Sequence, residues 1–220
     1  MIKVENVDVW GFEHAIRGMR NPMNSWNKSD SKFFNDYDNG TRDFILGKND
    51  LDLMKRLYKS GTEHRTYARM IQVSMDITAP LYWWKEMDRY TVGKSQVSCS
   101  TMHKIHAKEF AVEDFSTEHL ETVARFDEDG EMHKPYMVLK VVIDCLNACR
   151  NSYLQTKNKT DWWQMIQLLP SSYNQKRTVC MSYETVFKII RERTGHKLDE
   201  WRGFVEILRR LPYVAEIIDE

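Results

Sequence analysis

The chain has 220 residues, of which 42% are hydrophobic, 12% aromatic and 29% charged. Its 32 Lys and Arg residues balance its 32 Asp and Glu residues, which excludes the general positive field that duplex-binding proteins use to attract phosphate. The aromatic content supplies too much buriable surface for a disordered chain. Because single cores commonly hold about 100–200 residues, we expect one compact domain over residues 1–220.

The sequence contains no segment typical of a membrane span or a secretory signal. No stretch approaches the roughly 18 consecutive apolar residues that a spanning helix needs, and Met1–Asn6 has no apolar signal core. We therefore expect a cytoplasmic protein without membrane or duplex nucleic-acid partners. A small anionic ligand stays open, since two or three well-placed cations suffice to bind one.

The first half of the chain mixes strand and helix patterns. Residues 2–20 predict a short strand followed by a helix. Residues 21–40 are rich in Asn, Asp and Ser and have no regular period, so we expect a long polar surface loop there. A helix should then cover residues 51–60 with Asp50 as its N-cap, and the alternating apolar residues at 71–77 predict a half-buried strand.

The second half is mainly helical by pattern. A tryptophan-rich helix should span residues 81–90 after Pro80, and further helices are expected at the ranges 141–154, 161–169, 183–193 and 199–210. Ser182 is suited to cap the helix at 183–193, and a strand is expected near residues 177–181. This order predicts an α+β fold with a central, mostly antiparallel sheet flanked by helices, although an α/β arrangement fits the same order.

Two local motifs could carry chemistry. Gly93-Lys94-Ser95 has the residues that end a phosphate loop, but Asp88 stands where such a loop needs an earlier glycine, and a predicted helix precedes the motif, which favours a simple turn. Cys99, His103 and His106 could ligate zinc, yet their spacing is not one of the common ones, so scattered polar residues are the alternative. Our site prediction contains no metal.

Arg193 ends the predicted helix at 183–193 on its apolar side. It lies on the same stripe as Val186, Ile189 and Ile190, because these positions follow the three-four spacing of one helix face. A guanidinium that faces the core needs a partner. That partner is either an internal side chain, which would make Arg193 structural, or an anionic ligand.

Two blocks of sequence have a distinctive order. Leu53–His64 reads as a helix, a glycine and a histidine, and is followed by a strand that runs to Ala79-Pro80 and by a helix that ends at Arg89. The second block runs from the Leu169-Pro170 pair through a strand to Arg193. In order and spacing these blocks, about half of the chain, resemble the flavin-dependent thymidylate synthases, the ThyX family.

The resemblance implies FAD as cofactor, dUMP as methyl acceptor, a folate as one-carbon donor, and a homotetramer with active sites between subunits. The family's Arg-His-Arg motif falls on Arg89-Tyr90-Thr91, and its motif serine falls on Cys99, next to Ser98. By this likeness the catalytic residues are Arg193, Cys99 and Ser98, and the cofactor-binding residues are His64, Arg89, Tyr90, Thr91 and Lys188.

The chain departs from the family at several arginines. Tyr90 and Thr91 replace two residues of the motif, Ile166 stands where the family has a phosphate-gripping arginine, and Glu184 replaces an arginine of the late helix. Losing charge-assisted hydrogen bonds should weaken dUMP binding unless other cations substitute. Candidates for that substitution are Lys94, Lys104, Lys176 and Arg177.

Three functional hypotheses follow. The first is a divergent ThyX-like enzyme that binds a flavin and a nucleotide and transfers a methyl group to a pyrimidine nucleotide such as dUMP. The second is a non-catalytic ThyX-fold homologue that acts as a structural or partner-binding oligomer, since most of the motif arginines are replaced. The third is a metal-dependent hydrolase built on Cys99, His103 and His106.

Overall fold

The computed structural model describes residues 2–36 and 41–219. The chain divides into two compact units. The first unit comprises residues 1–3, 77–89 and 97–177, and the second comprises residues 4–76, 90–96 and 178–220. Two such units can belong to one domain, so the expectation of one domain stays a prediction.

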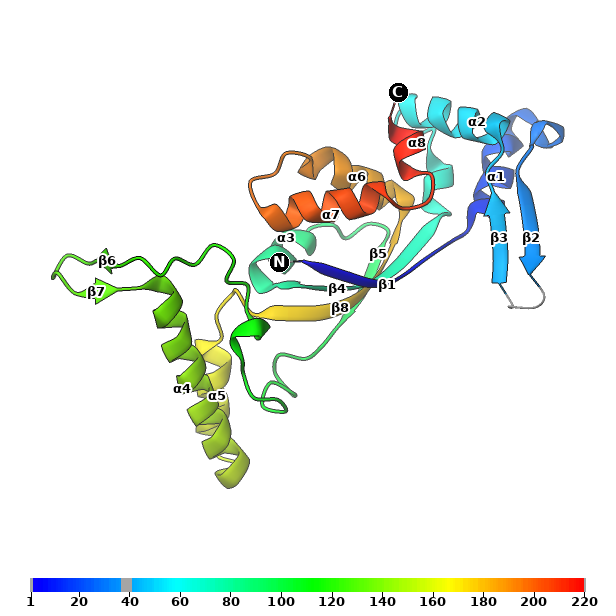
Figure 1. Cartoon of the computed structure of the whole chain (residues 1–220). Coiled ribbons are helices and arrows are strands. Elements are labelled where there is room, and N and C mark those ends of the chain that lie inside the picture. The colour runs from blue at the N-terminus through cyan, green and yellow to red at the C-terminus, as the bar shows by residue number, and fades with distance from the viewer. Residues whose placement is uncertain (1, 37–40, 220) are drawn as a thin grey trace. The chain divides into compact units, whose positions relative to one another are not determined.

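The fold is α+β, as the sequence predicts, with a central and mostly antiparallel sheet (Figure 1). Its strands are hydrogen-bonded in the order β1 (Lys3–Trp10), β4 (Gln72–Pro80), β8 (Asn174–Ser182), β5 (Lys94–Ser98). Two small antiparallel hairpins complete the strands: β2 (Lys32–Asp36) with β3 (Thr41–Ile45), and β6 (Arg125–Phe126) with β7 (Met132–His133).

The helices flank this sheet. Their bounds are α1 (Phe12–Arg20), α2 (Lys48–Lys59), α3 (Leu81–Met87), α4 (Pro135–Thr156), α5 (Lys159–Leu168), α6 (Tyr183–Arg193), α7 (Asp199–Arg209) and α8 (Val214–Ile218). Short 3-10 turns lie at Asn21–Met23, Trp26–Lys28, Thr66–Arg69 and Val112–Asp114. Among the described helices, none is both long enough and apolar enough to cross a membrane.

Strand β4 confirms the strongest strand prediction. Its side chains alternate along the strand, with Val73, Met75 and Ile77 buried and the residues between them half-buried. A period of two places alternate side chains on opposite faces of a strand, so one face of β4 packs into the core. Strand β8 extends further than predicted, over residues 174–182 instead of 177–181.

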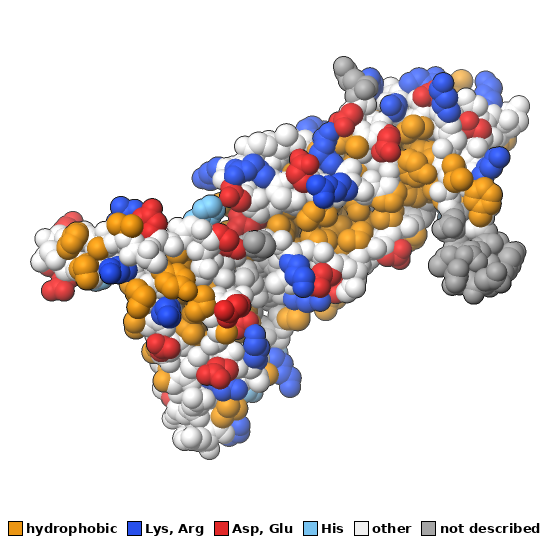
Figure 2. Space-filling view, in the orientation of Figure 1, with side chains coloured by type: hydrophobic (Ala, Val, Ile, Leu, Met, Phe, Trp, Pro, Cys, Tyr) orange, Lys and Arg blue, Asp and Glu red, His pale blue; other side chains and the backbone are white. Residues whose placement is uncertain are grey.

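Helices α4 and α5 form a helical hairpin in the first unit and lie side by side (Figure 1). Leu139, Ile143 and Leu146 of α4 pack in one hydrophobic cluster with Met165 of α5. Other apolar side chains of this region stay exposed, and Figure 2 shows hydrophobic surface over the start of α4 and the β6–β7 hairpin. They are Phe126, Met132, Met137, Val138 and Val141.

The prediction of a long polar loop at residues 21–40 is wrong for the part of this segment that the structure describes. This segment holds two 3-10 turns and strand β2, while residues 37–40 lie outside the described residues. Phe33 of β2 pairs with Phe44 of β3, their rings stacked 4.8 Å apart, and Phe44 stacks in turn on Phe12. Aromatic cross-strand contacts therefore stabilise a hairpin whose sequence has little strand pattern.

The prediction that Asp50 is the N-cap of the helix at residues 51–60 is wrong. Helix α2 begins one turn earlier, with Gly47 at the N-cap, and Asp50 is buried within its first turn. The capping role belongs to Asp30, whose carboxylate accepts hydrogen bonds from the backbone N–H groups of Asn49 (3.0 Å) and Asp50 (3.2 Å). A carboxylate at this position satisfies helix donors and complements the helix dipole.

The junction between β8 and α6 confirms Ser182 as the cap of α6. The Ser182 side chain accepts from the backbone N–H of Thr185, and its own backbone N–H donates to the carbonyl of Gly93 at 2.9 Å. The Thr185 hydroxyl donates to the carbonyl of Val92 at 2.8 Å. The start of α6 is thus tied to the turn at residues 92–93. Of the Gly-Lys-Ser motif, Gly93 lies in this turn, and Lys94 and Ser95 begin strand β5.

Gly93→Ala should disrupt this junction. Gly93 has φ +68°, and an added Cβ would lie 2.7 Å from the Ser182 hydroxyl and 3.0 Å from that of Thr185. Gly195→Ala is a matched control, because Gly195 has φ +75° and open space around it. We expect each change to lower the free energy of unfolding by about 1–2 kcal/mol for the left-handed backbone.

Gly93→Ala should lose about 1 kcal/mol more than Gly195→Ala, because it also displaces the helix cap. Urea unfolding followed by circular dichroism measures both losses. Equal losses in the two variants would show that the contact between the turn and α6 contributes nothing to stability.

Candidate functional site

The candidate site is built around Arg193, the last residue of α6, within the second unit. Its Nε donates a hydrogen bond to the Tyr90 hydroxyl at 2.9 Å. Its guanidinium carbon lies 4.4 Å from the centre of the Trp201 ring and 5.6 Å from that of Tyr90. The Tyr90 hydroxyl in turn donates to Glu192 at 3.0 Å. Arg193 is therefore held by one hydrogen-bonded and one stacked aromatic partner.

His196 closes the other side of the guanidinium. Nη1 of Arg193 lies 3.0 Å from Nε2 of His196, and Nδ1 of His196 accepts from the backbone N–H of Leu198 at 3.2 Å. His196 is therefore positioned by the backbone of the turn after α6 and lies against the guanidinium of Arg193.

Local sequence explains this geometry. Gly195, with φ +75°, follows the end of α6 and allows the chain to turn back into α7. Helices α6 and α7 then lie side by side (Figure 1), which brings the fully buried Trp201 of α7 under the guanidinium. Tyr90 is also buried, and its ring meets Trp201 edge-on at 6.0 Å.

Burial raises the pKa of the Tyr90 phenol, the hydrogen bond to Glu192 acts in the same direction, and the hydrogen bond from Arg193 opposes both. The phenol therefore keeps its proton at neutral pH and can accept from Arg193 while it donates to Glu192. Arg193 is half-buried, whereas Tyr90 and Trp201 are closed to solvent. The arrangement presents an immobilised cation to an anion or a carbonyl oxygen, with the aromatic residues behind it.

The structure brings three of the predicted site residues together. Arg193 and Tyr90 are hydrogen-bonded, and the Lys188 ammonium lies 5.8 Å from the centre of the Tyr90 ring. Thr91 follows Tyr90 and is exposed. His64 is exposed in the turn after α2, where its backbone N–H donates to the carbonyl of Gly61 at 3.2 Å.

The remaining predicted residues belong to the first unit. Arg89 is exposed just after α3, and Ser98 is exposed at the end of β5. Cys99 is also exposed, and its backbone is anchored to the neighbouring segment: its N–H donates to the carbonyl of Lys176 at 2.9 Å, and its carbonyl accepts from Gln175 at 2.7 Å. Roles for these residues stay predictions.

Metal ligation was the basis of the third hypothesis. In the ranges 2–36 and 41–219, no group of three or more His, Cys, Asp or Glu side chains is placed to hold a metal ion. His103 is exposed and His106 half-buried, and the His106 ring contacts Tyr153 edge-on at 4.9 Å.

One departure from the resembling family is accommodated by a new ion pair. Glu184, which stands where that family has an arginine, accepts from Arg65 at 2.8 Å. Arg65 is buried and lies 5.1 Å above the ring of Tyr58. The reversed charge on α6 is therefore balanced within the second unit.

Several residues of the site have no signal in the sequence. His196 and Trp201 contact the guanidinium of Arg193, and Glu192 accepts from the Tyr90 hydroxyl that Arg193 bonds. The spacing of α6 indicates that Arg193 faces the core, but its partners lie on other elements. An aromatic residue on the apolar face of α7 was the one available hint for Trp201.

The fold that contains this site is ThyX-like. Two solved structures of the flavin-dependent thymidylate synthase ThyX from Helicobacter pylori, both with FAD and dUMP, are similar to this chain. One is 15% identical, with 100% of this chain and 98% of that chain covered and a TM-score of 0.67. The other is also 15% identical, with 99% and 98% covered and a TM-score of 0.66.

No protein-family model and no curated protein sequence matches this chain. The structural similarity, at 15% sequence identity, shows a shared fold. A shared fold does not by itself determine a function.

Proposed function

We propose that this chain is a divergent ThyX-like enzyme that binds FAD and a pyrimidine nucleotide such as dUMP. It would transfer a methyl group from a folate donor to the pyrimidine, which is a step of dTMP biosynthesis. The observation that carries the proposal is the fixed guanidinium of Arg193, hydrogen-bonded to Tyr90 and stacked on Trp201. Support from the fold comes from similar structures that contain FAD and dUMP.

The residues of the site fit an anionic ligand that contacts Arg193 from its solvent side. Tyr90 and Trp201 are buried, so they would position Arg193 without touching the ligand. Arg193 and the exposed Lys188 would make the contacts, with Arg193 donating to a carbonyl oxygen of the pyrimidine and Lys188 contacting a charged group. A bound flavin would supply the redox chemistry, and the protein would supply binding and orientation.

Further contacts are proposed on the resemblance alone. His64, Arg89 and Thr91, which are all exposed, would hold the charged part of the flavin, whereas the buried Tyr90, predicted to contact it as well, would act through Arg193. Ser98 or Cys99, both exposed where β5 ends, would contact the nucleotide.

The competing candidate is a non-catalytic homologue that keeps the fold as an oligomer. One observation favours it: Tyr90, in the centre of the segment that resembles the Arg-His-Arg motif, is buried and bonded to Arg193 and Glu192. A residue used in this way adds no cation to a nucleotide site.

Titration with FAD, FMN and dUMP separates the two candidates. We expect the purified protein to change the visible spectrum of an added flavin, and Arg193→Ala to weaken dUMP binding by about tenfold or more, since it removes a charged hydrogen-bond donor. Arg191→Ala is the matched control, because Arg191 is exposed on the same helix; it should bind like the unaltered protein.

Isothermal calorimetry measures dUMP binding and absorbance measures the flavin. A colourless protein that takes up neither FAD nor FMN at high concentration would remove the enzyme proposal. Equal effects of Arg193→Ala and Arg191→Ala would remove the assigned role of Arg193.

We also propose a homotetramer. The exposed apolar side chains over α4 and the β6–β7 hairpin support an interface there (Figure 2), because monomers seldom leave large apolar patches uncovered. Light scattering at micromolar concentration should give four times the chain mass of 26.2 kDa, and Val141→Glu should lower that mass. A monomer in both cases would contradict this assignment.

A further inference from the structure

A basic cavity lies in the second unit, built from residues that the proposed nucleotide site does not use. It has a volume of about 660 Å³ and lies between the end of α1, the turn at Trp26–Lys28 and helix α2. Its walls carry five cationic side chains and one carboxylate: Arg20, Lys28, Lys55, Arg56, Lys59 and Asp52. Such an excess of one charge is unusual around a cavity, since like charges repel.

Helix α2 supplies most of this charge from one face. Asp52, Lys55, Arg56 and Lys59 are spaced by three or four residues, so their side chains lie along one side of the helix. Like charges at this spacing destabilise a helix. The helix dipole offsets the cost for Arg56 and Lys59 in the last turn, but it does not account for the cations that face them from α1 and the Trp26–Lys28 turn.

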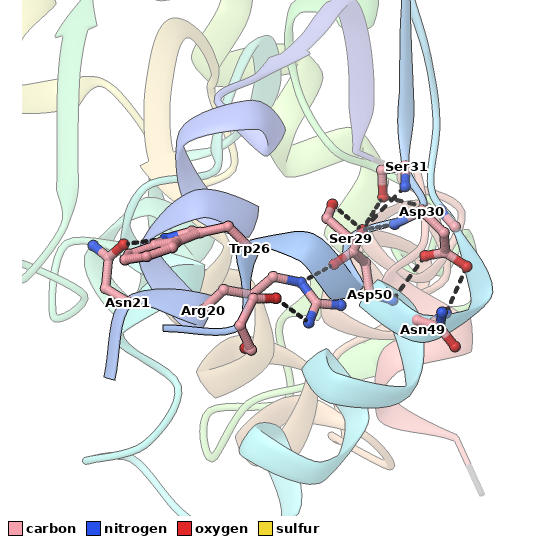
Figure 3. A network of polar contacts seen from close by, with 10 residues as sticks. Arg20, Asn21, Trp26, Ser29, Asp30, Ser31, Asn49 and Asp50 are labelled. Carbon is pink, nitrogen blue, oxygen red and sulfur yellow. Dashed lines mark hydrogen bonds and ion pairs between the residues drawn. The ribbon is translucent and has the colours of Figure 1, made fainter. Parts of the chain in front are cut away.

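Arg20 is the buried member of this cluster. Only 4% of it is exposed, its Nε donates to Asp50 at 2.6 Å, and its Nη1 donates to the carbonyl of Ser25 at 3.2 Å (Figure 3). Its Nη2 is buried without a hydrogen-bond partner in the part of the chain that the structure describes. A charged donor left unsatisfied in the interior is costly, so it calls for an acceptor.

Asp50 cannot provide that acceptor, because its second oxygen is already used. Oδ2 accepts from the Ser29 hydroxyl at 2.7 Å, from both the backbone and the hydroxyl of Ser31, and from the backbone of Asp30 (Figure 3). Burial raises the pKa of Asp50, but the hydrogen bonds from Ser31, Ser29 and Arg20 outweigh it and hold the pKa below its usual value. Arg20 thus donates to only one carboxylate oxygen of Asp50, through Nε, and its Nη2 has no acceptor among the described residues.

We propose that this cavity binds the polyphosphate group of a small molecule. Nη2 of Arg20 would donate to a phosphate oxygen, and Lys28, Lys55 and Lys59 would neutralise the remaining charge. No ion pair or side-chain hydrogen bond ties the ammonium groups of these three lysines to any described residue. A polyphosphate fits better than a single phosphate, because one phosphate carries about two negative charges. The five cations of the lining face two carboxylates, Asp52 and the Asp50 that is paired with Arg20, which leaves an excess of three positive charges.

Calorimetry with sodium tripolyphosphate as the probe tests this site. In about 50 mM salt we expect the protein to bind the probe with a dissociation constant below about 1 mM, and binding should weaken as salt is added. The double variant Lys55→Gln/Lys59→Gln should bind at least about tenfold more weakly, because two charged donors are lost. Lys48→Gln is the control, since Lys48 is exposed on α2 but outside the cavity lining.

Four outcomes would overturn the proposal. They are no binding to the unaltered protein, an equal loss in Lys48→Gln, binding that is lost in Arg193→Ala but not in the double variant, and tighter binding of a DNA oligonucleotide that competes with tripolyphosphate. Arg193→Ala also separates this site from the proposed enzyme function: it should weaken dUMP binding by about tenfold or more and leave tripolyphosphate binding unchanged. Unchanged circular dichroism in each variant shows that the fold is retained.

Discussion

The position of helix α6 is the constraint on which the candidate site depends. Its first turn is fixed by the hydrogen bonds from Ser182 and Thr185 to the carbonyls of Gly93 and Val92. Its last residue, Arg193, is fixed by the hydroxyl of Tyr90. The four residues 90–93 therefore contact both ends of a helix that is about 16 Å long. A short segment can do this because the Arg193 and Tyr90 side chains reach toward each other.

The contacts of residues 90–93 with both ends of α6 keep the guanidinium of Arg193 in place. Preorganisation of a cation avoids the entropy cost of ordering a long side chain when a ligand arrives. Here the ordering is done by the stacked Trp201 and by the hydrogen bond to Tyr90. Arg65 is also held in place, by its ion pair with Glu184 of α6 and by the ring of Tyr58 beneath it.

The sequence predicts elements well where the pattern is local. The alternation in β4, the bounds of α6 and the capping role of Ser182 all follow from neighbouring residues, and the structure confirms them. The direction of Arg193 toward the core also follows from helix spacing. What failed depends on distant contacts: Phe33 forms a strand because Phe44 stacks on it, and Asp50 is buried because Asp30 takes over the cap. Trp201 and His196 belong to the site for the same long-range reason.

A neutral total charge hides two separate groups of cations in the second unit, one at Arg193 and Lys188 and one along α2. We propose that residues 90–93 hold Arg193 in position for a pyrimidine nucleotide. The structure of a crystal of the protein soaked with dUMP tests this position of the nucleotide. With dUMP bound, the base should lie within about 3 Å of the Arg193 guanidinium, and that group should still be stacked on Trp201. A nucleotide bound elsewhere, with Arg193 turned into solvent, would contradict it.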